Sequence, residues 1–113
     1  MSAGWPERNA ERFDEIVAAT LEHPTPRETI LAHMNACYRF YDLGLGVEEI
    51  DAPALVIHGT EDLIVPPENG RMLARRLPNA RLVELPGRGH NLMLEDPETF
   101  NALVLDFALS LRS

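Results

Sequence analysis

Two segments of the chain carry side chains that could act together as an acid and a base. The stretch HGTEDLIVPP contains Glu61 and Asp62, and the stretch PGRGHNLM contains His90. A carboxylate that accepts the imidazole N–H of a histidine fixes the ring tautomer and stabilises the imidazolium that forms when the ring takes a proton. These residue types therefore predict proton transfer by His90, provided that the fold brings the two segments together.

The elements around these segments follow the order strand, helix, strand, helix. A nearly continuous apolar run at 54–57 is typical of a strand buried on both faces of a parallel sheet, and ARLVEL at 80–85 predicts a second strand. The final helix is expected to begin with Asp96 as N-cap and Pro97 at the first helical position. In such a parallel sheet, functional groups gather beyond the carboxyl ends of the strands. The acid and the histidine are therefore expected at one edge of the sheet.

Residues 1–46 are expected to be helical throughout. Apolar side chains at helical spacing predict a first helix around 13–21, and the segment HPTPRE interrupts it. Thr25, Pro26 and Glu28 form the pattern of a helix start, and Gly44 is a plausible end of this second helix. The sequence thus predicts a helical hairpin followed by a βαβα unit over residues 47–113.

The motifs of the βαβα unit resemble those of the C-terminal third of an α/β-hydrolase. An apolar strand ending in H-G-x-x-D, a proline-bearing turn and helix, a strand followed by G-x-G-H, and an acidic PE helix start occur in this order. The resemblance implies the C-terminal βαβα unit of that fold, with two parallel strands and flanking helices. It places Asp62, rather than Glu61, at the position of the triad acid and His90 at that of the triad histidine. Residues 1–46 resemble the end of the helical cap.

The nucleophile of that family lies on a G-x-S-x-G elbow, which this sequence does not contain. The resemblance therefore implies part of a hydrolase of esters, lactones or related carboxylic bonds that supplies the acid and the base and is inactive alone. A small ester-like molecule is the expected substrate of the completed enzyme. Whether the nucleophile is Ser, Cys or Asp stays open, because an aspartate would leave His90 only the activation of water.

A non-catalytic alternative also stays open. Two parallel strands leave unpaired edges, so the chain could be a remnant that self-associates through them as a binding or structural module. Either a homo-oligomer or a missing N-terminal half is therefore the expected partner.

Composition and charge exclude several other classes. Ten Lys and Arg residues against eighteen Asp and Glu residues give a net charge of −8, which argues against a nucleic-acid-binding protein. No apolar run approaches the roughly 20 residues of a membrane-spanning helix, and no signal-peptide pattern is present, so a cytoplasmic protein without membrane association is expected.

Other candidate side chains are interpreted as structural. Cys37 lies on the apolar stripe of a helix, which argues against a nucleophile, and His58 ends the first strand. No His, Cys, Asp or Glu cluster has the spacing of a zinc site, so neither a metal nor a cofactor is expected.

Overall fold

In the computed structural model the chain forms two compact units, and the structure describes residues 1–42 and 46–112. One unit comprises Asn9–Gly46, and the other comprises Met1–Arg8 together with Val47–Ser113. The first eight residues, which include the short helix α1 (Trp5–Arg8), thus belong with the sheet rather than with the helices that follow them.

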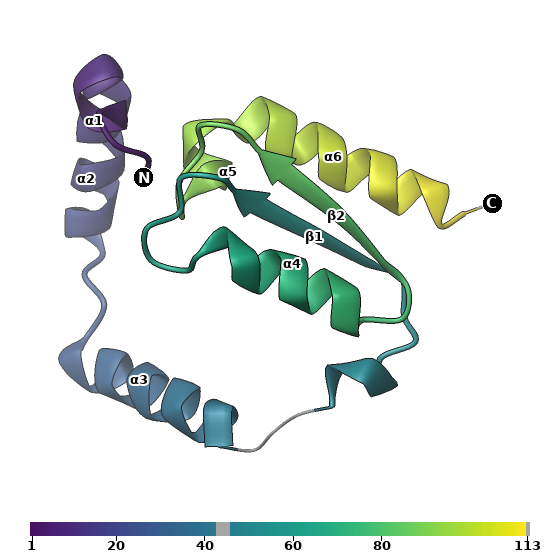
Figure 1. Ribbon diagram of the computed structural model, residues 1–113. Coiled ribbons are helices and arrows are strands. Elements are labelled where there is room, and N and C mark those ends of the chain that lie inside the picture. The colour runs from purple at the N-terminus through teal and green to yellow at the C-terminus, as the bar shows by residue number, and fades with distance from the viewer. Residues whose placement is uncertain (43–45, 113) are drawn as a thin grey trace. The chain divides into compact units, whose positions relative to one another are not determined.

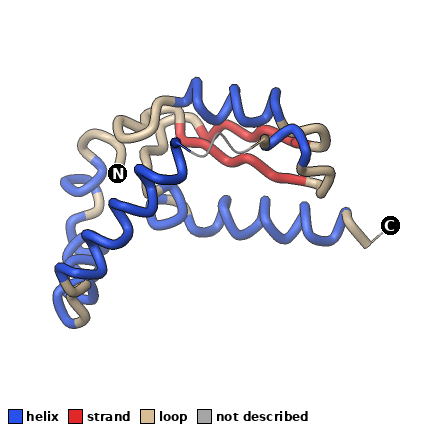
Figure 2. The backbone as a smooth tube through the Cα atoms, turned by 90° about the horizontal axis from the view of Figure 1, so that it is seen from below, coloured by secondary structure: helices blue, strands red, loops and turns tan. Residues whose placement is uncertain are grey.

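The sheet of the second unit consists of two parallel strands, as the sequence predicts. β1 (Ala54–Gly59) pairs with β2 (Ala80–Leu85), with Ala54 opposite Ala80 and Gly59 opposite Leu85. Helices α4 (Pro67–Arg76) and α6 (Pro97–Ser110) lie on opposite faces of these strands (Figures 1 and 2). Two parallel strands with flanking helices are the arrangement that the resemblance to α/β-hydrolases implies.

Local sequence accounts for the start of α6, the last helix of this unit. Pro97 occupies the first turn of α6, and the Asp96 carboxylate accepts the backbone N–H of Thr99 at 3.2 Å, so the predicted N-cap is confirmed. Two further elements are too short for a periodic signal: a 3₁₀ turn at Val47–Glu49 and the helix α5 (Leu92–Glu95).

The core of this unit is small. Trp5, Leu85 and Leu92 are buried, whereas the residues of β1 before Gly59 are only half-buried. The expectation that β1 is buried on both faces is therefore not fully met. The reason is that each strand has a single hydrogen-bonded neighbour within the described residues, so each has one open edge.

The other unit contains the two helices predicted before the sheet. α2 (Ala10–Glu22) and α3 (Arg27–Asp42) are separated at the proline-containing segment, as expected. The predicted helix end at Gly44 lies outside the described residues, as do the side chains of Phe40 and Tyr41.

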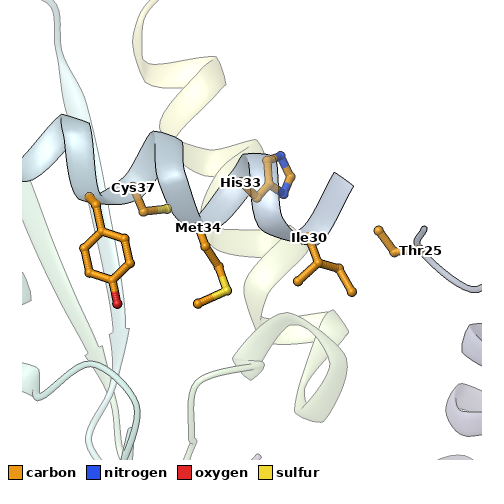
Figure 3. A pocket seen from close by; sticks show the side chains of 6 residues that line it. Thr25, Ile30, His33, Met34 and Cys37 are labelled. Atoms are coloured by element: carbon orange, nitrogen blue, oxygen red, sulfur yellow. The ribbon is translucent and has the colours of Figure 1, made fainter. Parts of the chain in front are cut away.

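The apolar stripe of α3 is largely uncovered. Ile30, Leu31 and Met34 are each about half exposed, and Cys37 is exposed although its place on the stripe suggested burial. Ile30 and Met34 extend to the same side of α3 (Figure 3). A hollow of about 510 Å³ adjoins this side, and its lining residues are Thr25, Ile30, His33, Met34, Cys37 and Tyr38.

Candidate active site

The two loops that follow β1 and β2 bring the predicted acid and histidine together. His90 Nδ1 lies 2.9 Å from Asp62 Oδ2. Because an ionised carboxylate can only accept a hydrogen bond, the Nδ1 atom carries the proton and donates a hydrogen bond to Asp62. Glu61, the alternative acid, has an exposed side chain, whereas the side chain of Asp62 is only 5% exposed.

Backbone amides support the carboxylate of Asp62 on its other side. Asp62 Oδ1 accepts the N–H groups of Ile64 and Val65, both at 2.9 Å. Burial acts to raise the pKa of Asp62, but hydrogen bonds from Val65, His90 and Ile64 outweigh it and hold the pKa below its ordinary value. Asp62 is therefore kept as a carboxylate, the form that can orient an imidazole.

His58 packs against the same carboxylate from the strand. Its Nε2 lies 2.9 Å from the carbonyl oxygen of Val65 and 3.5 Å from Asp62 Oδ2. Since a carbonyl can only accept, Nε2 carries the proton. The ring therefore fixes the loop that holds Asp62, in keeping with the structural role predicted for His58.

Hydrogen bonds between the two loops set the position of His90. The backbone N–H of Glu61 donates to the carbonyl of Arg88 at 2.9 Å, and the N–H of Gly87 donates to Thr60 Oγ1 at 3.0 Å. Gly87 has a φ of +70°, a left-handed conformation that favours glycine. The turn before His90 is thus fastened to the turn before Asp62.

Glu95 is the part of this site that sequence reasoning missed. Its side chain is fully buried, and its carboxylate accepts the backbone N–H of Gly89 and both the N–H and the hydroxyl of Ser2. No local spacing reveals this residue, because Ser2 is 93 positions away in the sequence. The only available signal was a carboxylate within an otherwise apolar segment, LMLE.

A pocket of about 220 Å³ lies beside the Asp62–His90 pair. The pocket is otherwise mostly apolar, and its lining comprises Ile57, His58, Asp62, Val65, His90, Leu92, Met93 and Phe100. The side chain of His90 is 43% exposed, and with Nδ1 bound to Asp62 its Nε2 is the nitrogen left to take a proton. The arrangement can therefore serve as a general base.

The hydroxyls of the described serines are engaged elsewhere. Ser2 donates its hydroxyl hydrogen to Glu95, and Ser110 donates its own to the carbonyl of Phe107 within α6. Ser113 lies outside the described residues.

Within residues 1–42 and 46–112, no group of three His, Cys, Asp or Glu side chains could hold a metal ion. None of the helices in this described part is long and apolar enough to cross a membrane.

Comparison with known proteins gives the same family from sequence and from structure. RutD of Caulobacter segnis, to which carbamate hydrolysis is ascribed, is 37% identical over 105 residues, which are 93% of this chain and 39% of RutD. The chain thus spans about two fifths of the length of the curated relatives it matches.

Two solved structures resemble the chain over 59% of its length. BpoC of Mycobacterium tuberculosis, to which a non-heme bromoperoxidase activity is ascribed, is 39% identical to this chain. The match has a TM-score of 0.58 and covers 25% of BpoC. MGS-MChE2, an α/β-hydrolase enzyme from the metagenome of sediments of the Mar Chica lagoon in Morocco, is 31% identical with a TM-score of 0.56 over 31% of its chain. A family model described as the alpha/beta hydrolase fold matches residues 7–97. The chain therefore belongs to the α/β-hydrolase-fold family.

Proposed function

We propose that this chain supplies the acid, Asp62, and the base, His90, of a catalytic triad in a hydrolase of ester, lactone or related carboxylic bonds. The observation that carries the proposal is the 2.9 Å contact between His90 Nδ1 and Asp62 Oδ2, made by a buried carboxylate and a half-exposed ring. A buried acceptor on Nδ1 directs Nε2 toward the reacting groups, as triad chemistry requires.

In the proposed mechanism, Nε2 of His90 removes the proton of a nucleophile as the nucleophile attacks a carbonyl carbon. Asp62 stabilises the imidazolium, which then protonates the leaving group. The same nitrogen next takes a proton from water, and the resulting hydroxide releases the acyl group. With an aspartate as nucleophile, only this second use of His90 remains.

The nucleophile is proposed to come from residues outside this chain. The sequence contains no G-x-S-x-G elbow, and the chain spans about two fifths of its curated relatives. We further propose that α2 and α3, the helices of residues 1–46 that lie outside the sheet-bearing unit, are the end of a cap; the family match begins at residue 7 and so includes both. The activity ascribed to RutD makes a carbamate a candidate substrate beside simple esters.

A chimaera tests this proposal. The part of Caulobacter segnis RutD that precedes its matched segment is joined to this chain, and hydrolysis of p-nitrophenyl acetate and of a carbamate is measured. The proposal predicts hydrolysis by the chimaera, with kcat lowered about 10²- to 10⁴-fold by His90→Ala. Asp62→Asn is expected to lower kcat as well, because Asn leaves the ring without its acceptor.

His23→Ala is the matched control, because His23 is an exposed histidine in the other unit and exposed imidazoles can hydrolyse activated esters without a site. If His23→Ala and His90→Ala change the rate equally, the observed hydrolysis does not come from the proposed pair.

Open strand edges favour a second candidate function. Within the described residues, β1 and β2 pair only with each other, and such edges attract further strands. In this alternative the chain pairs with a second copy of itself and acts as a binding or structural module. Native mass spectrometry decides between the two: a homodimer supports the alternative, and a complex with a nucleophile-bearing polypeptide supports the hydrolase.

A further inference from the structure

We infer that Glu95 is a positioning residue for His90: it binds the N–H of the Arg88–Gly89 peptide, one residue before the histidine, and so helps to hold the ring at hydrogen-bond distance from Asp62. This inference rests on the proposed role of His90 as the base. Glu95 is not a member of the proposed triad, and its role can be tested without any hydrolytic activity.

The clamp is a single carboxylate that faces donors from two parts of the chain. Glu95 Oε1 and Oε2 lie 3.2 and 3.3 Å from the backbone nitrogen of Gly89. The backbone N–H of Ser2 reaches Oε1 and the Ser2 hydroxyl reaches Oε2, both at 2.7 Å. Glu95 therefore joins the turn before His90 to the N-terminal segment.

Burial makes this clamp rigid. The side chain of Glu95 is fully buried, and Ser2 is 2% exposed. Charge-assisted hydrogen bonds are stronger than neutral ones, and a buried carboxylate deprived of its donors carries a large desolvation cost. The Gly89 peptide therefore cannot turn away from Glu95 without a substantial loss of free energy.

The backbone at Gly89 is closely packed on the side where a Cβ atom would lie. A Cβ atom at this position would lie 3.0 Å from Glu95 Oε1 and would overlap the backbone of Met1 and Ser2. Since His90 is the next residue, this packing and the hydrogen bond to the Gly89 N–H restrict where the Cα of His90 can lie. Glu95 and Ser2 therefore act together with the hydrogen bonds between the two loops to hold His90 within reach of Asp62.

A double-mutant cycle measures the consequence. The coupling free energy between Asp62 and His90 is obtained from urea unfolding of the chain with Asp62→Asn, His90→Ala and both substitutions. The cycle is then repeated in a Glu95→Gln background, where an amide replaces the carboxylate at nearly constant volume. The inference predicts a favourable coupling in the parent chain that falls to zero within error in the Glu95→Gln background.

Asp96→Asn is the matched control background. Asp96 binds Arg88 at 2.8 Å, so this substitution also weakens the same loop, but it leaves the contacts of Glu95 intact. A residue that only stabilises the fold would lower the overall stability and leave the coupling unchanged. Retention of the full coupling in Glu95→Gln would therefore overturn the inference, and its loss in Asp96→Asn would show that any weakening of the loop suffices.

A second measurement serves if Glu95→Gln does not fold. In the parent chain, the amide proton of Gly89 and the Nδ1 proton of His90 are followed by hydrogen exchange. The inference predicts that both protons exchange with one opening free energy, because release of Gly89 from Glu95 is the step that lets His90 leave Asp62. Independent opening of the His90 proton while Gly89 stays protected would refute it. Neither outcome depends on hydrolysis, so an inactive chimaera would count against the proposed function alone.

Discussion

His90 Nδ1 and Asp62 Oδ2 lie 2.9 Å apart although the two residues are separated by 28 positions in the sequence. The parallel pairing of β1 with β2 makes this contact possible, because it places Gly59 opposite Leu85 and so starts both loops at the same edge. Hydrogen bonds between the loops then set the separation of the two side chains. The proposed acid–base pair is thus a direct product of the βαβ order.

The substitution Gly70→Ala tests the support that His58 gives to Asp62. In an exposed helix interior this change would stabilise by about 1 kcal/mol. Here the new Cβ would lie 2.6 Å from His58 Nδ1, so we expect a net destabilisation of about 1–3 kcal/mol in urea unfolding. Asn69→Ala, at an exposed neighbouring position in α4, should cost little or nothing. A stabilised Gly70→Ala variant would show that the ring of His58 moves freely.

Asp62 should give the chain a defined acid dependence. Its folded pKa lies below the ordinary value of 3.8, so its contribution to stability is complete well above that pH and is lost as the pH falls through the folded pKa. Asp62→Asn is expected to cost about 1–3 kcal/mol near neutral pH. This difference from the parent chain should shrink as the pH falls from about 5 to about 2. Unfolding titrations across this range check it, and a difference independent of pH would contradict it.

Asp96 is expected to stabilise α6 as its N-cap. Asp96→Ala removes the acceptor for the Thr99 N–H and the partner of Arg88, and we expect a loss of about 1 kcal/mol or slightly more. Glu98→Ala, an exposed position in the same helical turn, is expected to lose about 0.5 kcal/mol through the helix dipole. Thermal or urea unfolding distinguishes them, and equal losses would argue against a capping role.

Local sequence patterns account for most of the sheet-bearing unit. Alternation of strand and helix signals predicted the parallel pair, and the dipeptide of Asp96 and Pro97 predicted the start of α6, because each depends on residues close together in the sequence. The sheet-edge rule predicted that Asp62 and His90 would meet. Their catalytic role stays a prediction.

Contacts between distant parts of the chain could not be predicted in the same way. The carboxylate of Glu95 is bound by Ser2, and no sequence periodicity links residues that are 93 positions apart. The exposure of Cys37 depends on what packs against α3, which the apolar stripe alone does not state. The half-burial of β1 likewise follows from the number of strands in the sheet, a property of the whole fold.

The proposed role of His90 as a base requires that Asp62 hold the ring with a proton on Nδ1 and a free lone pair on Nε2. Nitrogen-15 NMR of the histidine side chains at neutral pH measures this tautomer directly, with His23 as an exposed reference and Asp62→Asn as the variant. We expect an Nδ1-protonated ring at His90 that reverts in Asp62→Asn to the mixed tautomers of His23. An Nε2-protonated His90, or a His90 spectrum unchanged by Asp62→Asn, would contradict it.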